Sequence, residues 1–282
     1  MSSKLSIGFL DASGNFDFED RFFGVGMLVV NEPGCLTDAL HKIFQRILIL
    51  SQDQRNQAVN RLIQSGNVDE VIRLLKKTKR FEMKYDRITP IKFALYKEAI
   101  EVFLKNPQCR FSCMIIDRNK EGFNRSFFNN SWNAYTSYVS TLVKREARNL
   151  IKQELFLVLD DISKPNSVSL PLEEIILRKA KHEDTLDEQN RAEIIGAIRI
   201  ESHSNLLMQL NDILLGCVML SFKMKVGVVS EKLIKRKGEV VYHLSSVLGK
   251  NILAETFTLH KPNYFSVWEV DFRKNKSGES DK

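Results

Sequence analysis

The chain has 282 residues and a formal net charge of +7, and 43% of its residues are hydrophobic and 27% charged. The length allows one large domain or two small ones, and the composition excludes a fully disordered chain because it supplies enough apolar surface for a sizeable core. The modest positive charge is compatible with a nucleic-acid partner but does not require one.

Membrane insertion and a disulfide framework are not expected from this sequence. It contains no run of about 18 apolar residues, the length of a membrane span, and the N-terminal residues lack the apolar stretch of a signal peptide. The cysteines form no Cys-x-x-Cys pair and no zinc-ligand spacing with histidine, so we expect reduced core cysteines at Cys35, Cys109, Cys113 and Cys217. Together these features predict a cytoplasmic protein.

Two strands open the predicted fold. Alternating apolar residues that end in a tight turn predict a strand over residues 5–11. An apolar run with two internal glycines predicts a second strand over 22–30, which pairs with the first as a hairpin. Pro33 and Gly34 are expected to close this hairpin.

A predicted helical insertion follows the hairpin. Apolar residues at helical spacing predict a helix over 37–50, with Thr37 as its N-cap. More polar helical sequence continues to Lys79 and is broken at Gly66. We therefore interpret residues 37–79 as one insertion.

The rest of the chain alternates predicted helices and strands. Helices are expected over 91–104, 132–151, 171–180 and 206–222, strands over 110–117, 155–160, 194–201 and 263–272, and an extended segment over 81–88. Ser204 is the expected N-cap of the helix over 206–222. The pattern predicts an α/β fold with a mixed sheet flanked by helices. We expect one domain over residues 1–272 and a disordered tail over 273–282.

Acidic residues end three of the predicted strands. Asp11 ends the first strand, Asp117 ends the strand over 110–117, and Asp160 ends the apolar strand and is followed by Asp161. In α/β sheets, ligands bind beyond the carboxyl ends of strands, so these side chains could converge on one edge. The alternative is that each is an ordinary turn or capping residue.

The apolar helix over 206–222 carries a fourth carboxylate. Gln209 and Asp212 are three residues apart and share one helix face. Gly216 lies one turn further, where a missing side chain lets another backbone approach closely. A carboxylate on a helix buried nearly all round is costly unless it is hydrogen-bonded, paired or bound to metal.

The extended segment adds Glu82 and Lys84, which point to the same side of a strand-like backbone. Such a pair is usually a solvated ion pair. Beside a carboxylate cluster, Lys84 could instead bind a phosphate or stabilise the developing charge of a transition state.

These motifs resemble those of a bacterial protein family. They read Phe-Leu-Asp11-Ala-Ser-Gly14-Asn, Glu82-Met-Lys84 and Leu-Met-Gln209-Leu-Asn-Asp212-Ile-Leu-Leu-Gly, with a closing strand Tyr264-Phe-Ser-Val-Trp268 of similar style. The combination resembles domain-of-unknown-function family 3800, which is identified by an Asp-Glu-Ser-Gly motif and a Gln-x-x-Asp motif. The resemblance implies a ribonuclease-H-like fold and nuclease activity, and some members of that family are associated with mobile elements or phage defence.

Position by position, the resemblance matches Asp11 to the first motif and Asp212 to the last, with Gln209 as its companion. Glu82 and Lys84 match a Glu-x-Lys element. One departure is that the family's glutamate after the first aspartate is Ala12 here. That change would weaken the protein if the glutamate supports metal or water. It would matter little if the side chain points away from the site, as strand alternation favours.

The resemblance also suggests how the carboxylates combine. In a ribonuclease-H-like sheet the first strand lies next to the fourth, and we take the strand over 110–117 as the fourth, which puts Asp117 beside Asp11. Asp160 is the rival third ligand. The predicted catalytic set is Asp11, Glu82, Lys84, Asp117 and Asp212, with Glu98 as a less favoured replacement for Glu82, and the predicted metal ligands are Asp11, Asp117, Asp160 and Asp212.

Oxygen ligands of this kind suit two Mg²⁺ or Mn²⁺ ions about 4 Å apart, which activate water and stabilise a leaving oxygen. Without metal, such crowding should make some carboxylates bind protons more readily. Ser13, with His203 as its partner, is a conceivable nucleophile, but the chain has no Gly-x-Ser-x-Gly elbow. We otherwise expect Ser13 and Gln209 to support the site.

The expected substrate is DNA or RNA. Basic residues that could track phosphates lie in two clusters, Lys144, Arg145 and Arg148, and Lys232, Lys235, Arg236 and Lys237. Two other hypotheses remain open. One is a catalytically inactive ribonuclease-H-like module that binds nucleic acid or a partner protein, such as one from the same operon. The other is a structural or regulatory partner in a defence operon, with an acidic edge that is merely solvated.

Overall fold

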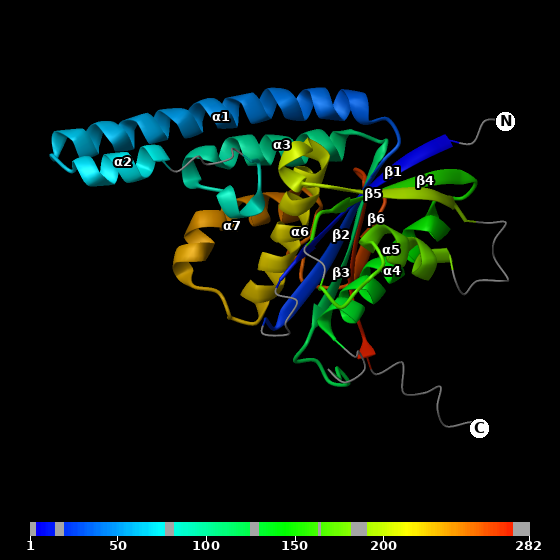
Figure 1. The fold of residues 1–282 in the computed structure, drawn as a ribbon. Helices are drawn as coiled ribbons and strands as arrows, with labels where there is room; N and C mark the ends of the chain where they lie inside the picture. The colour runs from blue at the N-terminus through cyan, green and yellow to red at the C-terminus, as the bar shows by residue number, and fades with distance from the viewer. Residues whose placement is uncertain are drawn as a thin grey trace, which may run out of the picture.

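We analysed a computed structural model of the chain, which describes residues 4–14, 20–76, 82–124, 130–162, 165–181 and 191–272. These residues form a seven-stranded mixed sheet with the strand order β5-β4-β1-β2-β3-β7-β6. Helices cover both faces of the sheet (Figure 1). The fold is therefore α/β with a mixed sheet, as the sequence predicts, and the expected tail over 273–282 lies outside the described residues.

The first three strands form an antiparallel meander. Strand β1 (Lys4–Ser13) pairs with β2 (Phe22–Val30), and β2 pairs with β3 (Cys109–Asp117). On the other side of β1, β4 (Gln153–Asp160) and then β5 (Glu193–Ile200) continue the sheet in parallel. Strand β1 therefore lies inside the sheet, between β2 and β4.

A second edge is built beside β3. Strand β7 (Tyr264–Glu269) runs parallel to β3, and the short β6 (Phe257–Leu259) pairs antiparallel with β7. This arrangement corrects one expectation. The strand over 110–117 was expected beside β1, but it is the third strand and is separated from β1 by β2. The parallel neighbour of β1 is β4, which ends in Asp160.

The helices divide between the two faces of the sheet. One face is covered by α6 (Leu206–Lys225), with α1 (Pro33–Gln64), α3 (Phe93–Lys105) and α7 (Glu231–Val247) packed around it, and the far end of α1 turns back as α2 (Val68–Lys76) (Figure 1). The opposite face is covered by α4 (Ser131–Asn149) and α5 (Leu172–Lys181). Each face has its own hydrophobic core.

Several predicted boundaries were wrong for local reasons. Pro33 starts α1 instead of closing the hairpin, because proline fits the first turn of a helix, so Thr37 is not a cap. The cap of α6 is Asn205, which accepts hydrogen bonds from the N–H groups of Leu207 and Met208, and not Ser204. Helix α7 and strand β6 were not predicted. Cys35 was expected in the core but is exposed.

Helix α6 is the central element of the core. Among the described residues it is the one helix long and apolar enough to cross a membrane, but 83% of its apolar window is buried inside the protein. It packs against β1 and β2 on one side and contacts the one-turn 3₁₀ helix Tyr85–Arg87 on another. Its burial identifies it as the core helix of this fold.

Gly216 on α6 accommodates the ring of Tyr85. A Cβ atom at this position would lie 2.2 Å from Tyr85 Cγ and 2.7 Å from Tyr85 Cβ. The expected close approach at Gly216 is therefore made by a side chain and not by a backbone. Because the atoms affected are near the Tyr85 backbone, a larger residue would have to displace the whole 3₁₀ turn.

We predict that Gly216→Ala lowers the free energy of unfolding by roughly 1–3 kcal/mol through overpacking, despite the higher helix propensity of alanine. Gly34→Ala is the matched control, because Gly34 is also helical and has no atom within 4 Å of a Cβ position. Urea unfolding of both variants measures the difference. Equal stability of the two variants would show that the Tyr85 side chain moves aside at no cost in stability, and would contradict the prediction.

Candidate active site at the carboxyl ends of strands β1 and β4

Two carboxylates meet where β1 and β4 end. Leu10 is in register with Leu159, so the next residues, Asp11 and Asp160, are neighbours on parallel strands. Two residues earlier on each strand, Phe9 and Val158 belong to the core on the α6 face. Because side chains alternate along a strand, Asp11 and Asp160 face α6 as well.

Helix α6 brings Asp212 close to this pair. The pKa of the Asp11 carboxyl is raised well above its usual range, first by burial and then by the negative charges of Asp212 and Asp160. Burial also raises the pKa of Asp212 to about 6, although the N–H of Tyr85 and the positive charge of Lys84 oppose the shift. The effect expected of crowded carboxylates is thus present at Asp11, whereas at Asp212 the main cause is burial and the charge that adds to it is that of Asp86.

Each carboxylate accepts one hydrogen bond from a backbone N–H. Asp11 Oδ1 accepts from Ala12 at 2.7 Å, Asp160 Oδ1 from Ser202 at 3.1 Å, and Asp212 Oδ2 from Tyr85 at 2.7 Å. Within the described residues, no hydrogen bond uses the second oxygen of any of the three. Three hard oxygen donors from two strands and one helix are therefore available to a ligand.

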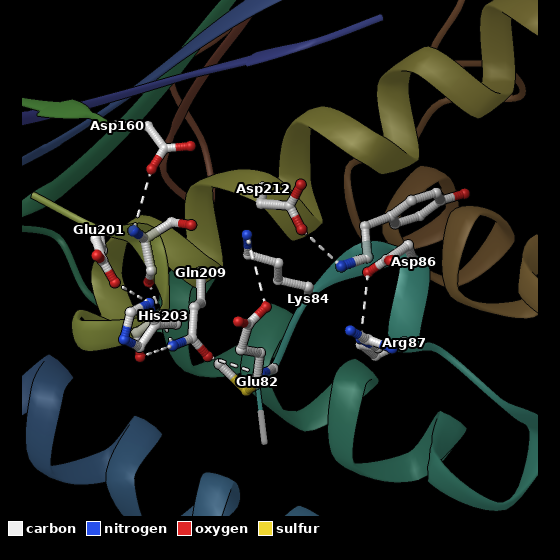
Figure 2. Close-up of polar contacts among 12 residues, drawn as sticks. Glu82, Lys84, Asp86, Arg87, Asp160, Glu201, His203, Gln209 and Asp212 are labelled. Carbon is white, nitrogen blue, oxygen red and sulfur yellow. Dashed lines mark hydrogen bonds and ion pairs between the residues drawn. The ribbon is translucent and has the colours of Figure 1, made fainter. Parts of the chain in front are cut away.

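Gln209 links the segments around these carboxylates. Its buried side-chain oxygen accepts from the N–H of Met83 at 2.7 Å, and its amide nitrogen donates to the carbonyls of Ser202 at 3.4 Å and His203 at 3.0 Å. Figure 2 shows contacts of Gln209 together with the separate hydrogen bonds that Asp160 and Asp212 accept. The Gln209 side chain therefore joins the loop beside Asp160 to the segment that carries Lys84.

Glu82 and Lys84 lie at this site as an ion pair. The Lys84 ammonium is 3.6 Å from a Glu82 carboxylate oxygen, and both side chains are mostly buried. In Figure 2 the ammonium points toward Asp212. The segment predicted as extended is extended at Lys84 and turns into the 3₁₀ helix at Tyr85.

The donor set fits a hard divalent cation in chemistry, because Mg²⁺ and Mn²⁺ prefer carboxylate oxygens. The arrangement is not a closed metal centre, however. Among the residues that the structure describes, no three His, Cys, Asp or Glu side chains stand close enough to hold a metal ion. Asp11, Asp160 and Asp212 are the residues whose oxygens could ligate a cation here.

Asp117 is not brought to this site. Asp11 pairs with Gly26 on β2, and Gly26 pairs with Cys113 on β3, so Asp11 is level with Cys113. Asp117 lies four residues beyond Cys113 along β3. At the usual strand rise and spacing the two aspartates are about 16 Å apart. Asp117 instead accepts two hydrogen bonds from Arg21, at 2.8 and 3.0 Å, and one from the N–H of Asn119. The predicted pairing of Asp117 with Asp11 was wrong, and Asp160 occupies that place.

The other predicted residues lie around or away from the site. Ala12 packs against the core under α4, on the face opposite Asp11. Ser13 is the last residue of β1 and pairs with Gly24. Glu98 on α3 forms an exposed ion pair with Arg46, which removes it from the carboxylate set.

The two basic clusters lie on opposite faces of the sheet, one on α4 and one on α7 (Figure 1). Arg145 donates to Ser266 Oγ at 3.0 Å and lies over the Trp268 ring, so it is engaged in the fold. Lys237 is buried over the Tyr85 ring, and Arg236 donates to backbone carbonyls. The two clusters therefore do not form one continuous surface.

Asn211 is a structural residue that the sequence interpretation missed. Its side-chain amide is fully buried and donates to the carbonyls of Phe9 on β1 and Gly26 on β2. A Cβ atom at Gly26 would lie 3.1 Å from the Asn211 side-chain oxygen, which explains one of the glycines inside β2. The available signal was an asparagine beside Asp212 in an otherwise apolar helix.

Comparisons of the chain with family models, with curated proteins and with solved structures found no match. The resemblance to family 3800 therefore rests on the short motifs alone.

The raised pKa of Asp212 predicts a specific pH dependence of stability. The folded protein holds this proton more tightly than the unfolded chain, so the stabilisation is present below pH about 4 and is lost as the pH rises to about 6. Without divalent metal, Asp212→Asn should stabilise the protein at pH 7.5 by roughly 2–3 kcal/mol. This gain should disappear near pH 4.

Chemical denaturation across this pH range, with EDTA present, measures the effect. Asp161→Asn is the control, because Asp161 is half exposed and pairs with Arg199 outside the cluster. A destabilised Asp212→Asn protein at pH 7.5 would contradict the assignment of a strained buried carboxylate.

Proposed function

We propose that this protein is a metal-dependent nuclease that hydrolyses phosphodiester bonds of DNA or RNA. The observation that carries the proposal is the gathering of Asp11, Asp160 and Asp212 from three separate elements, where the charges of Asp212 and Asp160 raise the pKa of Asp11. Buried carboxylates that repel one another are costly and are characteristic of sites that bind cations or perform chemistry. The net charge of +7 is compatible with a polyanionic substrate.

The strand order supports the more specific proposal of a ribonuclease-H-like fold. In that fold the first strand lies next to the fourth, and here β1 is flanked by the parallel β4 and the antiparallel β2. The strands β6 and β7 would then be additions beside β3. This proposal agrees with the motif resemblance, which also suggests a role in phage defence or in a mobile element.

Each residue has a distinct role in the proposed reaction. Asp11, Asp160 and Asp212 would hold one or two Mg²⁺ or Mn²⁺ ions, which when bound supply charge stabilisation and a more acidic water. Lys84 would bind a non-bridging phosphate oxygen, as its flexible stem and point charge allow. Gln209 holds the backbone beside Lys84 and the carbonyls next to Asp160, and Glu82 orients the ammonium.

A catalytically inactive binding module is the second candidate. It is favoured by one observation, that the described carboxylates do not form a ready metal centre. The alanine at position 12 is not evidence for this inactive module, because the Ala12 side chain faces the core under α4 and away from Asp11. The two candidates differ in one measurable property, metal-dependent cleavage.

We predict that the protein cuts labelled single- or double-stranded DNA or RNA with Mn²⁺ or Mg²⁺ and not with EDTA. Asp212→Asn should lower the cleavage rate at least 100-fold, because the remaining carboxylates would hold the metal poorly. Asp11→Asn and Asp160→Asn should have similar effects.

Asp117→Asn is the control in the cleavage assay, since that carboxylate pairs with Arg21 outside the site. Loss of cleavage in Asp117→Asn, together with an active Asp160→Asn protein, would restore Asp117 as the third ligand. Salt-dependent binding of nucleic acid without any cleavage would support the inactive module.

A further inference from the structure

The backbone around Lys84 is fixed at three consecutive residues. The N–H of Met83 donates to Gln209 at 2.7 Å, the carbonyl of Lys84 accepts from the Tyr96 hydroxyl at 3.1 Å, and the N–H of Tyr85 donates to Asp212 at 2.7 Å. The side chains of Gln209 and Tyr96 are buried, and that of Asp212 is partly buried. The Lys84 carbonyl also accepts from the N–H of Arg87 at 3.0 Å, so a 3₁₀-type hydrogen bond and these side chains together hold the segment.

The ammonium of Lys84 extends from this backbone toward the carboxylate cluster (Figure 2), and its ion pair among the described residues is with Glu82. It lies 3.6 Å from Glu82, and 27% of the side chain is exposed. Its positive charge favours the ionised forms of both Asp11 and Asp212. Figure 2 shows the ammonium in the region between Glu82 and Asp212.

Asp11, Asp160 and Asp212 place up to three negative charges at one edge of the sheet. Asp11 is more than nine-tenths buried, and its one hydrogen bond within the described residues comes from the N–H of Ala12. Burial of unpaired charge is costly, so a cation within the cluster offsets part of this cost. Lys84 is the cation that acts on both Asp11 and Asp212.

We propose that Lys84 is a tethered counter-cation of this cluster, which a divalent metal ion displaces on binding. The inference rests on the proposed function, because it assumes that the carboxylates bind metal. Two cations this close repel each other strongly in a partly buried site. Because the Lys84 backbone is fixed, only its four-carbon stem moves, and the ammonium turns outward to where a substrate phosphate would lie.

This arrangement couples metal binding to substrate binding. Without metal, the ammonium is held by the cluster and by Glu82. With metal, it is released for a phosphate oxygen. The protein would thus bind a phosphodiester better after the metal has entered.

The proposal predicts that Lys84→Met binds Mn²⁺ about 10-fold more tightly than the wild type, because the competing cation is gone. Isothermal titration of the full chain with MnCl₂ measures this change without any cleavage assay. Lys105→Met is the matched control and should bind as the wild type does, since Lys105 is exposed and pairs with Glu101 on α3.

The outcomes separate the inference from the proposed function. Tighter Mn²⁺ binding by Lys84→Met, or binding by this variant alone, supports the inference. If Lys84→Met binds Mn²⁺ as tightly as the wild type or more weakly, the inference about Lys84 is wrong, but the proposed metal site is not contradicted. Absence of Mn²⁺ binding by the wild type and by Lys84→Met overturns both.

A second measurement covers the case in which Lys84→Met folds poorly. Without metal, Lys84→Gln should have a lower melting temperature than the wild type, and saturating Mn²⁺ should raise the melting temperature of Lys84→Gln by more than that of the wild type. An equal Mn²⁺ shift in both proteins would overturn the inference. Lys84→Arg, which keeps the charge, should show the wild-type Mn²⁺ shift.

Discussion

Helix α6 is buried nearly all round, and its polar side chains must therefore be paired inside the protein. Asn211 donates to backbone carbonyls of β1 and β2, whereas Gln209 and Asp212 accept from the segment that carries Lys84. A buried polar group without a partner costs about 1–3 kcal/mol, so these pairings fix the rotation of α6 about its axis. The same rotation that lets the Asn211 amide nitrogen donate to both strands turns Asp212 toward Asp11.

This arrangement makes the site costly in the absence of a ligand. Asp11 and Asp212 both have raised pKa values, first because burial disfavours their ionised forms. The negative charges of Asp212 and Asp160 add to this effect at Asp11, and the charge of Asp86 adds to it at Asp212. Apolar or neutral residues of similar size at these positions would avoid this cost. The fold instead holds the carboxylates in place with backbone N–H groups and offsets their charge with Lys84 and, at Asp212, also with Lys237. Stability is thereby lower at neutral pH than it would be with a neutral cluster, and a bound cation would restore it.

Local patterns in the sequence predicted the mixed α/β fold, most strand positions, and Asp11 and Asp212 as site residues. They did not decide between Asp117 and Asp160, because both follow an apolar strand and strand order depends on long-range crossovers. The pure apolar run before Asp160 was the useful signal, since it is typical of a strand covered on both faces. Asn211 and the Tyr85–Gly216 contact depend on tertiary packing, which spacing along the chain does not reveal.

The most direct test of the account is a crystal structure of the full chain with Mn²⁺, using anomalous scattering to locate the metal. The account predicts an anomalous peak in contact with carboxylate oxygens of Asp11, Asp160 and Asp212, with the Lys84 ammonium turned away from it. A peak at Asp117, or none at the cluster at saturating Mn²⁺, would contradict the claim that α6 completes a metal-binding site with β1 and β4.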